Sequence, residues 1–273
     1  MFSTLTCVQL EHSAALQQMR NDYLHTLIAP MDGMWESAVI SQATFWEIQD
    51  RGQRAGYFCI NSENDLLRFS LLAEYQVQAQ AIFRRVISTY GIQHAIASTI
   101  EPFYFSLCLD IQAHMTLHSY LFHDHKRVEL SAEHGRNLIR KASKEEFVPL
   151  LHFYQANTAG PGAWIAPFLR TRLACEELFV LYDQQTVVAT GECIPSQTQT
   201  PYADLGMVVA QAYRGQGFGS SVLIQLKNHC YATGWKPICS CAADNYASKK
   251  AIEKAGFLSE QRMVEITFSM SQP

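Results

Sequence analysis

Short apolar runs alternate with longer amphipathic segments through the second half of the chain. The runs have the length of buried strands and lie at 178–181, 187–194, 205–209, 238–242 and 263–269. The segments 220–233 and 245–255 have the spacing of helices, and each is followed by a glycine, Gly234 and Gly256, that suits a helix end. Ser143 and Glu146 predict a capping box that opens a further helix. We therefore expect this half to fold as an α/β domain.

The first half shows a similar alternation. Two apolar runs around a polar turn predict an antiparallel hairpin at 56–61 and 66–72. The elements expected after it are a helix at 79–90 stopped by Gly91, a strand at 94–99, a short helix at 102–109 and a strand at 115–122. Residues 5–55 are expected to be helices and loops, with helices at 10–27 and 44–53.

The order of the first half, two strands, a helix, a strand, a short helix and a strand, repeats in the second half. This repetition indicates an internal duplication. The polar, turn-like stretch 131–135 separates the halves, so we place the boundary near Gly135 and the domains at 1–135 and 136–273. An unrelated pair of α/β patterns is the alternative interpretation.

A glycine-rich segment, Tyr213 to Gly219, lies between a predicted strand and a predicted helix. Its three glycines at alternate positions leave backbone amides accessible to a ligand. The helix behind them adds unpaired N–H groups and the positive end of a dipole, which together suit a phosphate or pyrophosphate. Arg214 adds a guanidinium suited to phosphate oxygens. The pattern is neither a P-loop nor the dinucleotide-binding fingerprint.

This segment resembles the acetyl-CoA-binding motif of the GCN5-related N-acetyltransferases (GNAT), through Arg214, Gly217 and Gly219. A second stretch resembles the family's asparagine helix and its closing Gly-Phe: Asn245-Tyr246-Ala247-Ser248, then Gly256-Phe257. The resemblance implies tandem GNAT-like α/β domains, each a mostly antiparallel mixed sheet flanked by helices. The first half lacks the motif, because 76–80 contains no glycine and Glu101-Pro102 stands where the asparagine belongs, so it is expected to have lost its cofactor site.

The resemblance also implies where acetyl-CoA would bind. The backbone of Met207, Val208 and Val209 would pair with the pantetheine arm, and the amides of Gln216, Gly217 and Gly219 would hold the pyrophosphate. The other implied cofactor-binding residues are Arg214, Gly215, Ser220, Asn245 and Ser248.

Catalysis requires a base that removes a proton from the acceptor ammonium. Asp204 and Glu192 are the acidic candidates, each with the alternative of a solvated edge residue, and the resemblance adds Asn245, which could equally be a plain helix cap. The family often places a tyrosine four residues before the Gly-Phe pair as general acid. Ile252 stands at that position here, and Tyr246 and Tyr231 are near it in sequence but do not match the pattern.

Charge and composition limit the kinds of partner and the cellular location that we expect. The net charge of −4 gives no sign of a nucleic-acid partner. The chain has no 18-residue apolar run and no segment resembling a signal peptide, so no membrane partner is expected. Eight scattered cysteines without a CxxC pair are typical of reduced thiols, so we expect a cytoplasmic protein. His114 and His118 would share a strand face, but no local set completes a metal site, and no metal is expected.

The sequence thus predicts an acetyl-CoA-dependent N-acyltransferase that transfers an acetyl group to an amine by direct attack. The acceptor is expected to be a small-molecule or peptide amine that the sequence does not identify. The oligomeric state is left open, with a homodimer as one expectation. A non-catalytic acetyl-CoA-binding or regulatory protein is one alternative, and a binding module for another phosphate-bearing ligand is a second.

Overall fold

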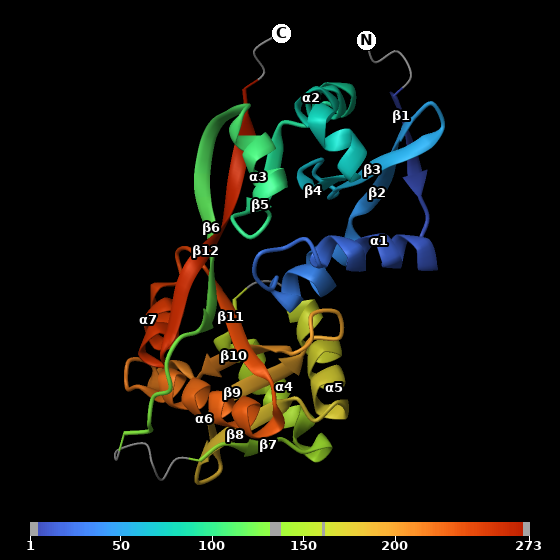
Figure 1. The fold of residues 1–273 in the computed structure, drawn as a ribbon. Helices are drawn as coiled ribbons and strands as arrows, with labels where there is room; N and C mark the ends of the chain where they lie inside the picture. The colour runs from blue at the N-terminus through green and yellow to red at the C-terminus, as the bar shows by residue number, and fades with distance from the viewer. Residues whose placement is uncertain (1–4, 132–137, 160–161, 270–273) are drawn as a thin grey trace. The chain divides into compact units, whose positions relative to one another are not determined.

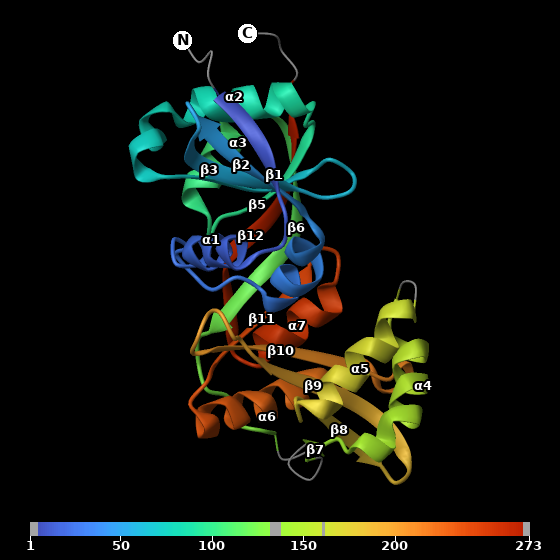
Figure 2. The ribbon, with the colours of Figure 1, turned by 90° about the vertical axis from the view of Figure 1, so that its right-hand side faces the viewer.

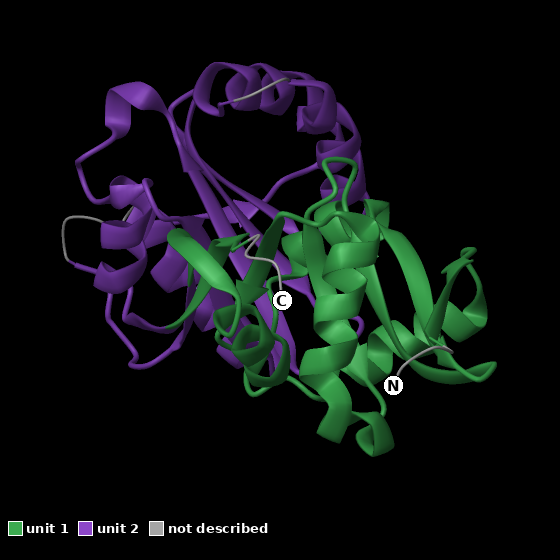
Figure 3. Cartoon of the chain, turned by 90° about the horizontal axis from the view of Figure 1, so that it is seen from above, with its two compact units in different colours: residues 1–120, 261–273 green, residues 121–260 purple. Residues whose placement is uncertain are grey.

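The computed structural model describes residues 5–131, 138–159 and 162–269 (Figure 1). The chain forms two compact units, which are coloured separately in Figure 3. Unit 1 comprises residues 1–120 and 261–273, and unit 2 comprises residues 121–260. The chain therefore enters unit 2 inside one long strand, β6 (Gln112–Asp124), and returns to unit 1 inside another, β12 (Phe257–Phe268). The predicted boundary at Gly135 lies outside the described residues.

Unit 1 contains a sheet with the strand order β1-β2-β3-β4-β5-β12-β6. Its other strands are β1 (Leu5–Leu10), β2 (Thr44–Asp50), β3 (Gln53–Ile60), β4 (Leu66–Leu71) and β5 (His94–Ser98). Its helices are α1 (Ala14–Leu24), α2 (Ala79–Tyr90) and α3 (Pro102–Leu109), with short helical turns η1 (Trp35–Val39), η2 (Ile40–Gln42) and η3 (Ala73–Gln78). The described pairings are antiparallel except β4 with β5, which is parallel.

The structure confirms most of the predicted elements of this unit. The hairpin is β3 and β4, the helices α2 and α3 have the predicted bounds, and Gly91 ends α2 in the left-handed region at φ 61°. The predicted helix at 44–53 is wrong, because 44–50 is the strand β2. Its β-branched and aromatic residues Thr44, Phe45, Trp46 and Ile48 favour an extended chain, and pairing on both edges with β1 and β3 stabilises it. The strand β1 lies where only helix and loop were expected.

Unit 2 contains a sheet with the strand order β6-β11-β10-β9-β8-β7. Its other strands are β7 (Arg140–Lys141), β8 (Leu178–Asp183), β9 (Thr186–Pro195), β10 (Tyr202–Val209) and β11 (Lys236–Ala242). Its helices are α4 (Phe147–Asn157), α5 (Ile165–Ala174), α6 (Phe218–Thr233) and α7 (Tyr246–Lys254), with short turns η4 (Lys144–Glu146), η5 (Gly162–Trp164) and η6 (Gln211–Tyr213). The capping box of Ser143 and Glu146 is present, as predicted.

Helices cover both faces of the unit 2 sheet, with α6 on one face and α4 and α5 on the other (Figure 2). Successive residues of β9 show the two faces directly. A Cβ at Gly191 would lie 2.7 Å from Val222 of α6, whereas Thr190 donates a hydrogen bond to Tyr154 of α4. Both units are therefore mixed, mostly antiparallel sheets flanked by helices, which confirms the predicted fold class.

Candidate functional site

Strands β10 and β11 separate part of the way along their length. Their parallel pairing covers only Tyr202, Ala203 and Asp204 of β10 against 236–238 of β11. Beyond this point β10 continues to Val209 and β11 continues to Ala242. The other edge of β10 stays paired with β9 as far as Val209. From Leu205 onward, the β10 edge that faces β11 therefore makes no strand pairing with it, which leaves an opening between two strands of the sheet.

The glycine-rich segment follows the end of β10 and leads into α6. Gly215 and Gly217 have φ angles of 77° and 90°, the left-handed region that glycine adopts without strain. Gly217 is the N-cap of α6, and no side chain caps this helix end. The first-turn amides of a 16-residue helix therefore lie next to the glycine loop, at the positive end of the helix dipole. An anion would be favoured at this position.

Gly219 lies inside the first turn of α6, where the helix packs closely on β10. A Cβ at this position would lie 3.4 Å from Met207 Sδ and 3.6 Å from Val209 Cγ2. It would also lie 3.4 Å from Ala251 of α7. The glycine thus allows α6, α7 and the side chains of β10 to meet at the opening. Ser220 donates a hydrogen bond back to the Gly217 carbonyl, at 2.9 Å.

Arg214 holds the glycine loop against neighbouring elements. Its Nε donates to the Val209 carbonyl at 3.1 Å, and its Nη2 donates to the Asn157 carbonyl at the end of α4, at 2.8 Å. The Asn157 side chain in turn accepts a hydrogen bond from the Gln211 amide at 2.8 Å. These contacts make Arg214 a positioning residue for the loop. Its direct binding of phosphate stays a prediction.

Helix α7 carries the predicted asparagine at its start. The Asn245 side chain accepts a hydrogen bond from the Ser248 amide at 3.1 Å, which confirms the predicted N-cap. Ile252, the residue at the usual tyrosine position, is 3% exposed and packs in the interior. The roles of Asn245 and Ser248 toward a cofactor stay predictions.

Glu192 provides a buried carboxylate on the sheet face that packs against α4. It lies opposite Gly206 of β10, and a Cβ at Gly206 would collide with the Glu192 carboxylate. The glycine therefore makes room for this group. Tyr154 of α4 donates a hydrogen bond to Glu192, and Thr190 donates to the Tyr154 hydroxyl at 3.0 Å. Burial raises the pKa of Glu192, and the Tyr154 hydrogen bond opposes that rise. Burial also raises the pKa of Tyr154, so its phenol stays protonated.

Asp204 is the second acidic candidate and is 9% exposed. It lies two residues before Gly206 on β10, so its side chain projects from the same face of the sheet as Glu192. The structure therefore brings both predicted acidic residues to the face covered by α4 and α5. Asp204 lies where β10 and β11 are still paired. Glu192 lies opposite Gly206 of β10, which is beyond the point where the two strands separate.

Tyr154, the hydrogen-bond partner of Glu192, packs among other aromatic side chains, and the sequence analysis selected none of these residues. The ring of Tyr154 lies 6.5 Å from that of Trp164 and 6.0 Å from that of Phe168. Trp164 is 40% exposed. Tyr154 and Glu192 are 38 residues apart in the chain, so no short motif links them. The sequence pattern predicted a helix after the capping box but gave no signal for its contact with Glu192.

The tyrosines named as substitute acids lie in different places. The Tyr231 hydroxyl donates to Asp124 at 2.7 Å, and its pKa is raised by burial and by that carboxylate. It lies in the last turn of α6, whereas the glycine loop adjoins the first turn, roughly 20 Å away along the helix axis. Tyr246 is 68% exposed in the first turn of α7. Tyr231 is therefore too far from the opening between β10 and β11 to act as a general acid there.

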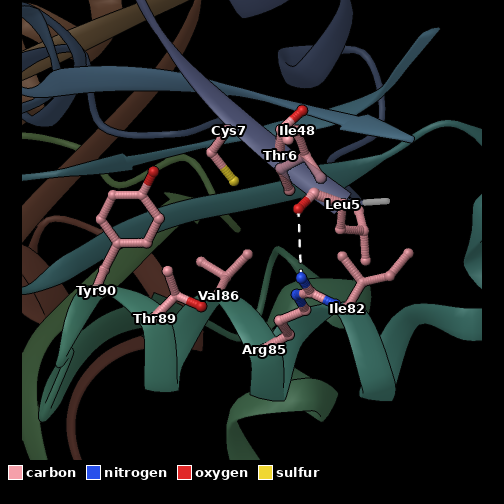
Figure 4. Close-up of a pocket in the computed structure, with 9 residues that line it drawn as sticks. All are labelled: Leu5, Thr6, Cys7, Ile48, Ile82, Arg85, Val86, Thr89 and Tyr90. Carbon is pink, nitrogen blue, oxygen red and sulfur yellow. Dashed lines mark hydrogen bonds between the residues drawn. The ribbon is translucent and has the colours of Figure 1, made fainter. Parts of the chain in front are cut away.

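Other features of the described chain do not extend this site. Within the described ranges, no three His, Cys, Asp or Glu side chains are grouped closely enough to hold a metal ion. None of the described helices is long and apolar enough to span a membrane. A separate pocket of about 260 Å³ lies in unit 1 between β1 and α2 (Figure 4). Its lining is mainly apolar, and Arg85 at its edge donates to the Leu5 carbonyl at 3.5 Å.

Comparisons with known proteins match both halves of the chain. Residues 12–125 match a family model described as an acetyltransferase (GNAT) domain, and residues 137–257 match one described as the acetyltransferase (GNAT) family. A solved acetyltransferase from the GNAT family from Colwellia psychrerythraea is 31% identical, with a TM-score of 0.91 over 97% of this chain and 100% of that chain. No curated protein matches the chain.

Two further solved structures share the fold at low identity. A GCN5-related N-acetyltransferase from Sphaerobacter thermophilus is 9% identical, with a TM-score of 0.65 over 96% of this chain and 94% of that chain. A tandem GNAT protein from the clavulanic acid biosynthesis pathway is 11% identical, with a TM-score of 0.63 over 98% of this chain and 99% of that chain. These two likenesses concern the fold alone.

Proposed function

Because the chain belongs to the GNAT acetyltransferase family, we propose that unit 2 transfers an acetyl group from acetyl-CoA to the nitrogen of an amine. The observation that carries this proposal is the opening between β10 and β11 next to the uncapped N-terminus of α6. When bound, acetyl-CoA supplies an acetyl thioester, which the nitrogen of a neutral amine attacks. The acceptor is a small-molecule or peptide amine.

The residues at the opening fit such a cofactor. The β10 backbone at Met207, Val208 and Val209 offers an edge that is not paired with β11. The amides of Gln216, Gly217 and Gly219, flanked by Gly215 and Ser220, lie at the positive end of α6 and suit a pyrophosphate. Arg214 fixes this loop to β10 and α4. Asn245 and Ser248 lie at the start of α7, which packs on α6.

The acceptor must lose a proton, and Glu192 is the group we propose as general base. A buried carboxylate with a raised pKa holds a proton more strongly than an exposed one and so accepts it more readily. Tyr154 orients the carboxylate and keeps part of it ionised. Asp204 on the same face attracts the ammonium form of the acceptor. The leaving thiolate receives no proton from position 252, because Ile252 has no acidic hydrogen.

A panel of amines tests the function directly. Free CoA release would be measured with amino acids, polyamines, aryl amines, lysine-containing peptides and peptide N-termini, with acetyl-CoA saturating. We expect turnover with at least one class. Tight binding of acetyl-CoA without turnover on any amine would contradict the proposed activity, and equal binding of ATP or NAD would contradict the proposed cofactor.

The glycine loop gives a prediction for cofactor affinity. Gly217→Asp places a carboxylate at the N-cap of α6, against the anion site, and gives an L-residue a φ of 90°. We expect acetyl-CoA affinity to fall at least about tenfold, or roughly 1.4 kcal/mol. Calorimetry would measure it, with circular dichroism to verify folding. Gly52→Asp is the matched control, because Gly52 also has a positive φ but lies in a unit 1 turn. A folded Gly217→Asp protein with unchanged affinity would refute this assignment.

Tyr154 gives a prediction for pH dependence. Tyr154→Phe removes the hydrogen bond that favours the ionised form of Glu192, so the pKa of Glu192 rises further. A base is active only when deprotonated, so activity is gained as pH rises through that pKa. We expect the rising limb of kcat/KM to move to higher pH by about one unit. A rising limb that stays at the wild-type pH would show that Tyr154 does not influence the pKa of the general base.

A further inference from the structure

Unit 1 holds a buried polar cluster on the sheet face that packs against α1. We call it the Arg68 cluster, and its members are Arg20, Tyr23, Glu36, Tyr57, Arg68 and Glu101. Arg68 on β4 has no exposed surface, and Tyr57 on β3 is 4% exposed. The cluster is distinct from the apolar core on the opposite face, where Phe58 and Phe69 pack with α2.

The two carboxylates of the cluster already have partners. Glu36 lies between two guanidinium groups: Oε1 contacts Arg68 Nη2, and Oε2 lies 3.6 Å from Arg20 Nη2. Glu101 accepts a hydrogen bond from the Tyr23 hydroxyl at 2.5 Å and another from the Ser98 amide at 3.0 Å. The Tyr23 ring also lies 4.1 Å from the Arg68 guanidinium carbon.

Several buried donors of the cluster have no acceptor. Within the described chain, Arg68 Nε and Nη1, Arg20 Nε and the Tyr57 hydroxyl make no hydrogen bond of ordinary geometry. Buried polar groups are paired in the great majority of cases, and an unpaired buried donor is costly. The three guanidinium N–H groups can only donate, and the Tyr57 hydroxyl can donate or accept, so a ligand that pairs with all four must supply acceptors. A purely structural cluster would be expected to match its donors internally.

The charge of the cluster indicates the kind of acceptor. Arg20 and Arg68 contribute two positive charges, and Glu36 contributes one negative charge. Burial raises the pKa of Glu101 to about 7, so near neutral pH this carboxyl is only partly ionised. The excess is therefore at most one positive charge. A carboxylate carries a single negative charge at pH 7, whereas a phosphate ester carries about 1.5 to 2, so a monocarboxylate matches the excess better.

The cluster lies beside a strand opening like the one in unit 2. Strands β4 and β5 pair at a single position, Leu66 with Ala95, and β4 continues to Leu71. Arg68 therefore lies just beyond the point where the two strands part. In unit 2 the corresponding face carries Glu192 and Asp204, which favour a cation. The opposite charge in unit 1 favours an anion, so the two openings suit different ligands.

We propose that unit 1 binds a small organic monocarboxylate, whose oxygens accept hydrogen bonds from Arg68 and from the Tyr57 hydroxyl. The binding is independent of acetyl transfer in unit 2. Arg20 and Glu36 are the members that reach solvent, with side chains 15% and 12% exposed, and they mark where the ligand enters.

Ligand-induced stabilisation of the full chain tests this proposal. Acetate, propionate and butyrate would be titrated at pH 7 and constant ionic strength with chloride as the balancing anion, and inorganic phosphate would form a separate arm. At about 100 Kd we expect the best carboxylate to raise Tm by roughly 5–10 °C, with a smaller effect from phosphate. The Gly217→Asp protein, altered only in unit 2, should respond like the wild type. A stronger effect of phosphate than of every carboxylate would overturn the proposal, as would no shift with any carboxylate, which would mean that water alone satisfies the donors.

Tyr57→Phe provides the sharpest variant, because the Tyr57 hydroxyl makes no hydrogen bond of ordinary geometry within the described chain and its ring remains. We expect Tm without ligand to be equal to or above the wild-type value, and carboxylate affinity by calorimetry to fall at least about tenfold. Tyr75→Phe, elsewhere in unit 1, is the matched control and should keep wild-type affinity. Arg68→Met should abolish binding, but it also removes an ion-pair partner of Glu36 and could prevent folding. Tyr57→Phe is therefore the variant that tests the assignment. Wild-type affinity in Tyr57→Phe would overturn the assignment.

Discussion

Replacing Glu192 by glutamine is expected to lower kcat/KM by about 10²–10⁴-fold, the range that a positioned general base contributes. Glutamine keeps the size of the side chain and can still accept the hydrogen bond from Tyr154, but it cannot take a proton from an ammonium. The acetyl-CoA affinity should stay close to wild type, because Glu192 lies on the α4 side of the sheet, whereas the glycine loop leads into α6.

The pH profile separates a base from a merely structural carboxylate. The raised pKa of Glu192 means that the wild-type rate gains a rising limb above the ordinary range of a glutamate, as the carboxylate ionises. Glu192→Gln should lose this limb and keep only the dependence that comes from the acceptor amine. Asp204→Asn is the informative comparison, and Glu145→Gln is the surface control, since Glu145 is fully exposed. Near wild-type kcat/KM in Glu192→Gln, with a large loss in Asp204→Asn, would transfer the role to Asp204.

The features that sequence reasoning predicted correctly have local causes. The left-handed helix end at Gly256, the Asn245 cap and the Ser143 capping box each depend on a few neighbouring residues. Backbone conformation at such positions is decided by sterics and by hydrogen bonds within one turn. Such local signals were sufficient to place the glycine loop between a strand and a helix, and therefore to locate the candidate cofactor site.

The features that could not be predicted depend on contacts between distant residues. Tyr154 meets Glu192 only because α4 packs on β9, and Gly206 is needed only because the Glu192 side chain crosses it. The stretch 44–50 becomes a strand because β1 and β3 pair with it on both sides, which overrides its local spacing. Unit 1 likewise includes the C-terminal part of β12, which pairs with β5 through Met263 and Ser98. No local pattern indicates that a half of the chain is completed by a strand from its far end.

Lys227 makes long-range contacts that the local sequence pattern of its helix does not indicate. It lies on α6, is 2% exposed, and its ammonium lies 2.7 Å from Asp124 Oδ1. The same nitrogen donates to the carbonyls of Lys126 at 2.8 Å and Ala255 at 3.0 Å. It also lies 4.6 Å from the centre of the Phe257 ring. One buried cation thus joins α6 to the segment after β6 and to the connection between α7 and β12.

Gly256 completes this junction. Its carbonyl accepts hydrogen bonds from the amides of His125 and Lys126, and its φ is 87°. A Cβ at this position would collide with the Lys126 carbonyl. The Gly-Phe pair therefore has a structural role in unit 2: the glycine admits the backbone at 125–126, and the phenylalanine ring faces the Lys227 ammonium. The position of α7, and hence of Asn245, depends on this packing.

Lys227→Ala is expected to lower the free energy of unfolding by about 3–5 kcal/mol, the cost of breaking a buried ion pair by removing one partner. The loss leaves the carbonyls of Lys126 and Ala255 without their donor. Lys227→Met keeps most of the aliphatic stem, so it separates lost packing from lost hydrogen bonding and should still cost most of this amount. Lys250→Ala, an exposed lysine on α7, should change stability by less than about 0.5 kcal/mol. Chemical denaturation followed by tryptophan fluorescence and circular dichroism would measure all three. A cost below about 1 kcal/mol for Lys227→Ala would show that the junction rests on backbone and aromatic packing rather than on the buried ammonium.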